Sequence, residues 1–190
     1  MTVKKRIFVV YVEDKPGVLN RVASLFRRRS YNIDSLSVGH TDRVGVSRMT
    51  IVMEADDRVA RLVEANLYKL VNVVHVKDVT WCPSVTRDLA LVKVKASAQQ
   101  RAEVLQIAEV FRARVVDVGK DALIVEITGT EDKIDGLLDV LRPFGIVEMA
   151  RTGTVAMARG SQSERIEPDF APAEIPEQDK ASPAESHVTS

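Results

Sequence analysis

Hydrophobic and polar positions along the chain alternate between strand-like and helix-like periods. Residues 6–13 (RIFVVYVE) are a β-branched and aromatic run, which predicts a strand. The apolar residues that follow recur three or four positions apart, which is typical of the buried face of a helix. This helix, expected to end between Arg29 and Tyr31, carries its apolar stripe at Val18, Leu19, Val22, Leu25 and Phe26.

The segments up to residue 81 complete a β-α-β-β-α-β order. Residues 33–39 and 46–53 alternate apolar and polar side chains on either side of the turn-forming segment HTDRVG, which predicts two neighbouring antiparallel strands. A second helical stripe and a strand at 73–81 follow. That stripe consists of Val59, Leu62, Val63, Leu67 and Leu70.

The same order returns after Pro83. Residues 88–96 predict a strand, residues 114–119 and 122–128 a hairpin, and residues 145–157 a last strand. We therefore predict the α+β class, with two ferredoxin-like units that each place two helices on one face of a four-stranded antiparallel sheet. The two helical stripes of the second unit are Val104, Leu105, Ile107, Ala108 and Phe111, and then Ile134, Leu137, Leu138 and Leu141.

Composition separates these two units from a tail. The first unit is assigned to residues 3–81 and the second to residues 84–160. Beyond Gly160 the chain is rich in Pro, Glu, Ala and Ser and poor in large apolar residues, so residues 161–190 are expected to be disordered. Each sheet is expected to leave its helix-free face and an edge strand open, which favours a homodimer.

The overall composition excludes several classes of protein. Lys plus Arg and Asp plus Glu each number 27, so no global charge favours nucleic acid or an anionic membrane. One cysteine, Cys82, excludes an internal disulfide framework, and three scattered histidines have no metal-site spacing. The chain has neither a signal peptide nor an apolar run of about 20 residues, so a cytoplasmic protein without membrane contact is expected.

No catalytic motif is present in the sequence. A phosphate-binding glycine loop, a nucleophile elbow and a histidine–carboxylate cluster are all missing, so we expect no catalysis and no bound cofactor. The central strands lack the aromatic residues on which RNA-binding proteins of this layout stack bases. The basic run at residues 27–29 is interpreted first as a solvated helix end, with an acidic partner subunit or nucleic acid as alternatives.

The turn between the first strand and the first helix is the strongest candidate for a binding site. Pro16 suits a first helical position, and Gly17 has no Cβ to shield the amides of Val18 and Leu19 from a carboxylate. The carboxylate of Asp14 would repel a lone anion but would suit an ammonium beside it. This combination favours a free amino acid, although these residue types also make ordinary turns.

Several motifs carry a family resemblance. The segment DKPGVLNRV, followed by SYNIDSLSV at 30–38, resembles an ACT domain, a small-molecule-binding regulatory module. The further segments SRMTI (47–51), RDLALVKV (87–94), FRARVVDV (111–118) and ARTGTVAMARG (150–160) resemble the small, regulatory subunit of acetolactate synthase. These matches cover residues 3 to 160 in order, and the second unit is expected to be ACT-like.

The resemblance implies a non-catalytic regulatory subunit in branched-chain amino-acid biosynthesis. Such a subunit binds a large catalytic subunit, raises its activity and confers feedback inhibition by valine. Thiamine diphosphate, Mg and FAD are expected on that catalytic subunit rather than on this chain. A free-standing amino-acid sensor that controls another protein is the rival interpretation.

The resemblance also implies where valine binds, which is between the ACT domains of two chains. One group belongs to the strand-to-helix turn, and the opposing group comes from the second chain. This sequence departs from the family at two of these positions, since the family often has Asn where this chain has Asp14 and Ser where it has Asn20. Isoleucine or leucine could share the site, because a difference of one methylene in the ligand changes the binding free energy by only about 1–3 kcal/mol. The turn group is Asp14, Pro16, Gly17, Val18, Leu19 and Asn20, and the opposing group is Asn32 and Ile33.

Overall fold

The computed structural model describes residues 2–160, so the predicted disorder of residues 161–190 lies outside the described residues. The first unit consists of β1 (Lys4–Glu13), α1 (Val18–Arg28), β2 (Ser35–His40), β3 (Val46–Ala55), α2 (Asp57–Leu67) and β4 (Val73–Asp78). The second unit consists of β5 (Ser84–Lys95), α3 (Arg101–Val110), β6 (Arg114–Val118), β7 (Ala122–Gly129), α4 (Glu131–Leu141), a short 3-10 helix η1 (Arg142–Phe144), β8 (Ile146–Arg151) and β9 (Val155–Ala158).

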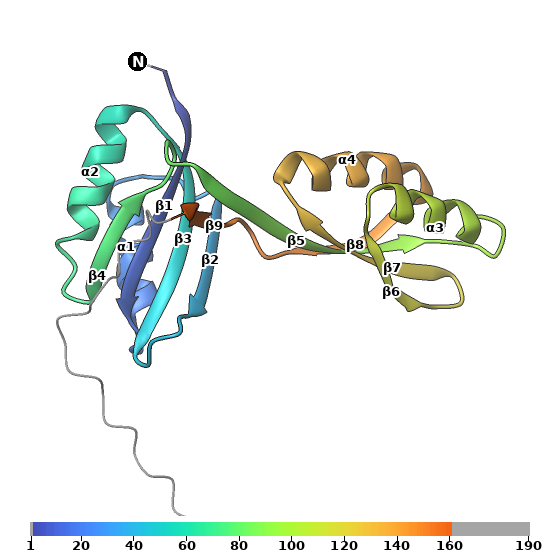
Figure 1. Cartoon of the computed structure of the whole chain (residues 1–190), viewed down its shortest axis with the longest axis horizontal. Helices are drawn as coiled ribbons and strands as arrows, with labels where there is room; N and C mark the ends of the chain where they lie inside the picture. Colours follow the sequence, from blue (N-terminus) through green and yellow to red (C-terminus); the bar gives the residue numbers. More distant parts are fainter. Residues whose placement is uncertain (1, 161–190) are drawn as a thin grey trace, which may run out of the picture.

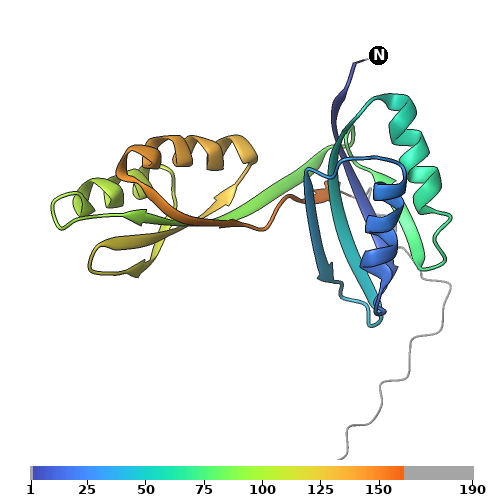
Figure 2. The ribbon, with the colours of Figure 1, turned by 180° about the vertical axis from the view of Figure 1, so that it is seen from behind.

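The two units have the same strand order. The first sheet runs β2-β3-β1-β4 and the second runs β6-β7-β5-β8, with antiparallel pairing throughout. In each unit both helices lie on one face of the sheet (Figures 1 and 2). The prediction of two ferredoxin-like α+β units is therefore confirmed.

The cores lie between each sheet and its helices. In the first unit alternate β1 residues such as Phe8 and Val10 pack against Val22 and Phe26 of α1. Two residues predicted for its helical stripes, Leu19 and Leu62, are instead 45% exposed, and Leu105 of the second unit is likewise 43% exposed. In α2 the buried stripe runs through Ala60, Val63, Asn66 and Leu67, one step around the helix from Leu62. The second unit repeats this arrangement, with Val92, Val125, Leu137 and Leu141 among its fully buried residues.

The long strand β5 and the short strand β9 join the two units, and both differ from the sequence-based prediction. β5 begins at Ser84 rather than at residue 88, and the last predicted strand is interrupted between β8 and β9. The interruption coincides with Gly153, whose φ of 79° turns the chain out of the second sheet. β9 then pairs with Ser84–Arg87 of β5 to form a two-stranded ribbon (Figure 1).

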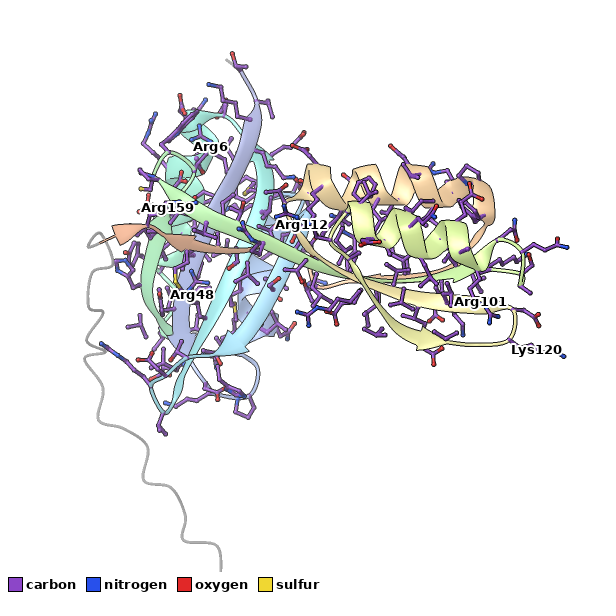
Figure 3. All side chains as sticks on the ribbon, turned by 45° about the vertical axis from the view of Figure 1, so that its right-hand side comes forward. Arg6, Arg48, Arg101, Arg112, Lys120 and Arg159 are labelled. Atoms are coloured by element: carbon purple, nitrogen blue, oxygen red, sulfur yellow. The ribbon has the colours of Figure 1, made fainter. Side chains whose placement is uncertain are left out.

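This ribbon covers part of the first sheet on the face that carries no helix. Ala156 of β9 is fully buried against Val9 and Val79, so the expectation that this face is open was wrong for that part. Arg48 of β3 stacks on the Tyr11 ring at 5.7 Å and donates to the carbonyl of Ala156 (Figure 3). The outer edge of β2 pairs with no strand within residues 2–160.

Candidate effector-binding site

The turn between β1 and α1 has the backbone conformation that its glycine predicts. Gly17 caps α1 with φ 84° and ψ −6°, in the left-handed region that strains any residue with a Cβ. No other atom lies within 4 Å of where a Cβ would stand, so the position opens to the surface. Pro16 was expected to begin the helix, but it lies in the turn before Gly17 and α1 starts at Val18.

The first turn of α1 leaves backbone donors open. It has no side-chain cap and no acidic residue, so nothing in the helix start competes with an anion. Val18 N donates to Lys15 O at 3.3 Å, which corrects the expectation that this amide is available. The amides of Leu19 and Asn20 have no hydrogen-bond partner within the described chain, and such N–H groups form an anion site with the helix dipole.

Asp14 lies beside this helix start and is held from two sides. Its amide donates to Gly45 O at 2.8 Å, which fixes the turn to the β2–β3 hairpin. Its carboxylate Oδ2 lies 3.1 Å from His40 Nδ1, at the last residue of β2. Both side chains are exposed, so the carboxylate remains accessible to a cationic group from solvent. Sequence reasoning missed His40 because only the hairpin brings residues 14 and 40 together.

A hydrogen-bonded network joins the end of β1, the helix α1 and the loop before β4. The side-chain amide of Asn72, which is 8% exposed, donates to Glu13 and accepts from Arg21 of α1. The hydrogen bond from Asn72, followed by that from Lys15, lowers the pKa of the Glu13 carboxyl below its ordinary value. The network therefore fixes the end of β1 to α1 around a charged carboxylate. Glu13, Arg21 and Asn72 lie too far apart in the sequence for a motif to reveal this network.

The second predicted group lies at the other end of α1. Asn32 is exposed and donates through Nδ2 to Asp34 Oδ1 at 2.8 Å, while half-buried Ile33 packs on the first core. Eleven residues at about 1.5 Å rise make α1 roughly 16 Å long, so one amino acid cannot bridge both ends within one chain. The structure thus brings residues 14–20 together and keeps Asn32 and Ile33 apart from them.

The described residues contain neither a metal-ion cluster nor a membrane-spanning helix. Among residues 2–160, no group of three or more His, Cys, Asp or Glu side chains is placed to hold a metal ion. In the same part of the chain no helix is long and apolar enough to cross a membrane. Val18, though predicted as a site residue, is buried and belongs with the core through its side chain.

Comparison with known proteins gives a consistent match over both units. Residues 8–75 match the family described as the AHAS small subunit-like ACT domain, and residues 87–160 match the small subunit of acetolactate synthase. A probable acetolactate synthase small subunit of Archaeoglobus fulgidus is 50% identical over 158 residues, which is 83% of this chain and 99% of that protein. The acetolactate synthase small subunit of Bacillus subtilis is 47% identical over 160 residues, 83% of this chain and 92% of the relative.

A solved structure shows the same fold over both units. The crystal structure of the acetolactate synthase small subunit from Thermotoga maritima superposes with a TM-score of 0.78 at 37% identity, covering 83% of this chain and 98% of that one. Both family matches, the relatives and this structure agree on residues that reach from β1 to β9. The chain therefore belongs to the acetolactate synthase small-subunit family.

Proposed function

We propose that this chain is the regulatory subunit of an acetolactate synthase, which it activates and makes sensitive to feedback inhibition by valine. The observation that carries the proposal is the open start of α1, where Gly17 exposes unpartnered amides beside the carboxylate of Asp14. A regulatory subunit needs a site for an end product, and this arrangement has the donors and the charge that a free amino acid requires.

Each group of valine has a counterpart in the proposed site. The amides of Leu19 and Asn20 take the carboxylate, with an interaction worth about 0.3–1 kcal/mol when exposed and up to about 2 when partly buried. The carboxylate of Asp14 takes the ammonium, and the exposed side chain of Leu19 adds apolar surface. The site selects branched side chains only modestly, so isoleucine and leucine bind more weakly but measurably.

A homodimer completes the site in this proposal. β2 lies at the sheet edge, with 47% of Val38 exposed, and its free edge can pair with the same edge of a second copy. If the two β2 strands pair antiparallel about a twofold axis, the start of one lies opposite the end of the other. Asn32 and Ile33 precede β2, while His40 at its end contacts Asp14. The pairing therefore brings the opposing group of one chain to the turn of its partner.

Catalysis is assigned to the large subunit in this proposal. Thiamine diphosphate, Mg and FAD belong there, and the present chain contributes affinity for that subunit and for valine. The naming of its relatives as acetolactate synthase small subunits supports this assignment, and a pull-down from native cells tests it. Recovery of a large thiamine-dependent enzyme supports it. Recovery of an unrelated protein in its place would favour a free-standing sensor.

The substitution Gly17→Asp tests the site. It adds a Cβ at a left-handed position and a negative charge where the valine carboxylate binds, so valine inhibition of the reconstituted enzyme is expected to disappear. Activation without valine should remain, because a Cβ at this position has no other atom within 4 Å and the turn lies at the surface. The measurement is a valine titration of acetolactate formation by variant and wild type, each combined with the catalytic subunit.

A matched control separates backbone strain from loss of the site. Gly160, after β9, also has a positive φ, 67°, with no atom within 4 Å of where a Cβ would stand, and it lies outside the proposed site. Gly160→Asp likewise adds a Cβ and a negative charge at an open positive-φ position and should keep its response to valine. Inhibition of Gly17→Asp at the wild-type valine concentration would contradict the site assignment.

A further inference from the structure

The connection between β8 and β9 crosses the first sheet in close contact with β2. These residues, Thr152–Thr154, are here called the strap. At the centre of the strap a Cβ on Gly153 would lie 2.4 Å from the Oγ of Ser35, and its φ of 79° also favours glycine. The strap therefore lies so close to β2 that a side chain at its centre does not fit.

Two serines of β2 bind the strap. Ser37 Oγ donates to Thr152 O at 2.9 Å, and Thr154 N donates to Ser35 Oγ at 2.9 Å. Side chains alternate along a strand, so both serines lie on the helix-free face while Leu36 between them packs into the core. The strap is thus attached to the strand that follows Asn32 and Ile33.

The N-terminal end of the strap is fixed to the second domain. Thr152 Oγ1 donates to Asp88 Oδ1 at 3.0 Å and accepts from Leu89 N at 3.1 Å. Asp88 is 6% exposed and also accepts from Arg151, which lies 2.8 Å from Asp135 of α4. Burial disfavours the charge of Arg151, but its bonds to both carboxylates outweigh this and hold its pKa above the ordinary value. Movement of the strap therefore moves β8 and α4 with it.

Beside the strap lies a cleft between the two units, which are here also called the first and second domains. It has a volume of about 360 Å³ and is lined by residues of both domains, including Asp34, Asp88 and the strap itself. Lys5 and Glu131 form an ion pair across it, but both side chains are about half exposed, and such pairs contribute little. The long strand β5 is the second covalent connection (Figure 1). The strap thus provides a hydrogen-bonded link at a place where the domains otherwise have room to move.

We propose that the strap transmits the state of the effector half-site at Asn32 and Ile33 to the second domain. Asn32 is bonded to Asp34, whose amide donates to Val52 O at 2.9 Å, and the next residue is Ser35. A ligand that favours one position of this segment therefore favours one position of the strap. The inference rests on the proposed function for the identity of the effector, valine, and it assigns Ser35 and Ser37 as positioning residues outside the binding site.

The double variant Ser35→Ala/Ser37→Ala tests this link, because it removes both strap hydrogen bonds and leaves residues 14–20, 32 and 33 unchanged. The full-length chain should bind valine with an affinity within about threefold of wild type by calorimetry. Hydrogen exchange of β8 and α4 should respond to valine at least about threefold less than in wild type. The valine inhibition of the enzyme reconstituted with its catalytic subunit should fall by a similar factor.

A matched control is the double variant Ser24→Ala/Ser84→Ala, because neither hydroxyl is hydrogen-bonded to the strap or to a helix end within the described residues; it should behave as wild type. Full inhibition and a full exchange response in Ser35→Ala/Ser37→Ala, with valine bound, would overturn the inference. If the wild-type chain binds no valine, the proposed function fails, and hydrogen exchange without ligand tests the strap instead. Thr152→Val should then change the hydrogen exchange of residues 32–37 when it is introduced into the wild-type chain, but not when it is added to Ser35→Ala/Ser37→Ala. An equal change in the two backgrounds would also overturn the inference.

Discussion

The β1–α1 turn of the first unit and the β5–α3 turn of the second share a backbone framework. In the first, Glu13 N donates to Asn72 O and Asp14 N donates to Gly45 O. In the second, Lys95 N donates to Gly145 O and Ala96 N donates to Asp121 O, at the equivalent places in the topology. The shared strand order therefore sets these backbone bonds, whichever side chains the turn carries.

The side chains of the two turns make different helix starts. The start of α1 has the exposed Gly17 and no side-chain cap. The start of α3 has no side-chain cap either, but Gln100, which is bonded to the Ser97 hydroxyl, stands in place of the glycine, and Glu103 supplies a negative charge in the first turn. Ala96 also stands where the first unit has Asp14. If the α1 start binds valine as proposed, the shared fold provides the position and a few side chains decide which of the two turns can use it.

Arg101 adds a further difference at α3. Its guanidinium donates to Gly119 O at 3.1 Å and to Lys120 O at 2.8 Å, so it binds the helix start to the β6–β7 hairpin. Figure 3 shows Arg101 and Lys120 at the end of the second domain far from the first. The first residue of α1, Val18, is an apolar core residue and makes no such bond. The α3 start is therefore held to its hairpin by a side chain that the α1 start lacks.

The substitution Asn20→Glu gives the α1 start the negative charge that Glu103 gives the α3 start. Asn20 is the third residue of α1, as Glu103 is of α3, so the variant places a carboxylate where valine's carboxylate is proposed to bind. Valine affinity should fall at least about thirtyfold, which corresponds to about 2 kcal/mol. The helix itself should be unharmed or stabilised by about 0.3–1 kcal/mol. Calorimetry of valine binding and urea unfolding of the full chain measure the two effects.

Asn20→Gln is the control, since it lengthens the side chain without charge. It should lose much less affinity than Asn20→Glu. Wild-type affinity in Asn20→Glu would show that the α1 start does not hold the carboxylate.

The sequence predicted the elements of both units because their apolar periods agree with local turn signals. The Gly17 turn was also predictable, since glycine after Asp and Pro indicates a left-handed start. The sequence predicted less accurately which residues at the margins of each apolar helical stripe are buried. Leu19 and Leu62 fit the three-to-four spacing, yet α1 and α2 rotate them to the edge of the core.

Features that depend on long-range contacts could not be predicted from the sequence. Gly153 signals a turn, but only the position of β2 explains why no side chain fits there. The extension of β5 to Ser84 depends on pairing with β9, about 70 residues later in the chain. Asn72 lies in the loop before β4 and His40 ends β2, and they gain their roles only from contact with Glu13 and Asp14.

Asn72→Ala removes a support that the first turn has and the second lacks. Because Asn72 is buried and bonded to both Glu13 and Arg21, its loss should cost about 1–2 kcal/mol of the free energy of unfolding at neutral pH. The turn should loosen, so valine affinity should fall several-fold. Urea unfolding and calorimetry measure these effects, and a loss below a few tenths of a kcal/mol would contradict the supporting role.

The pH dependence of this variant gives a second measurement of the same network. A carboxyl whose pKa is lowered on folding, as that of Glu13 is, contributes its full stability at pH values above its ordinary pKa and loses that contribution as the pH falls through its folded-state pKa. Asn72 is the largest cause of the lowered pKa. The stability difference between wild type and Asn72→Ala should therefore be largest above the ordinary pKa of Glu13 and should shrink in acid. A difference that grows in acid would contradict this account.

Glu103→Asn tests the comparison from the other side and should have the smallest effect. It removes the acidic residue from the first turn of α3, so the free energy of unfolding should fall by about 0.3–1 kcal/mol. It should not create a valine site, because Gln100 stands where α1 has Gly17 and Ala96 offers no carboxylate for an ammonium. Calorimetry on a chain that combines Glu103→Asn with Gly17→Asp isolates the second unit. Valine binding by that chain would mean that the charge in the first turn, rather than the glycine and Asp14, distinguishes the two helix starts.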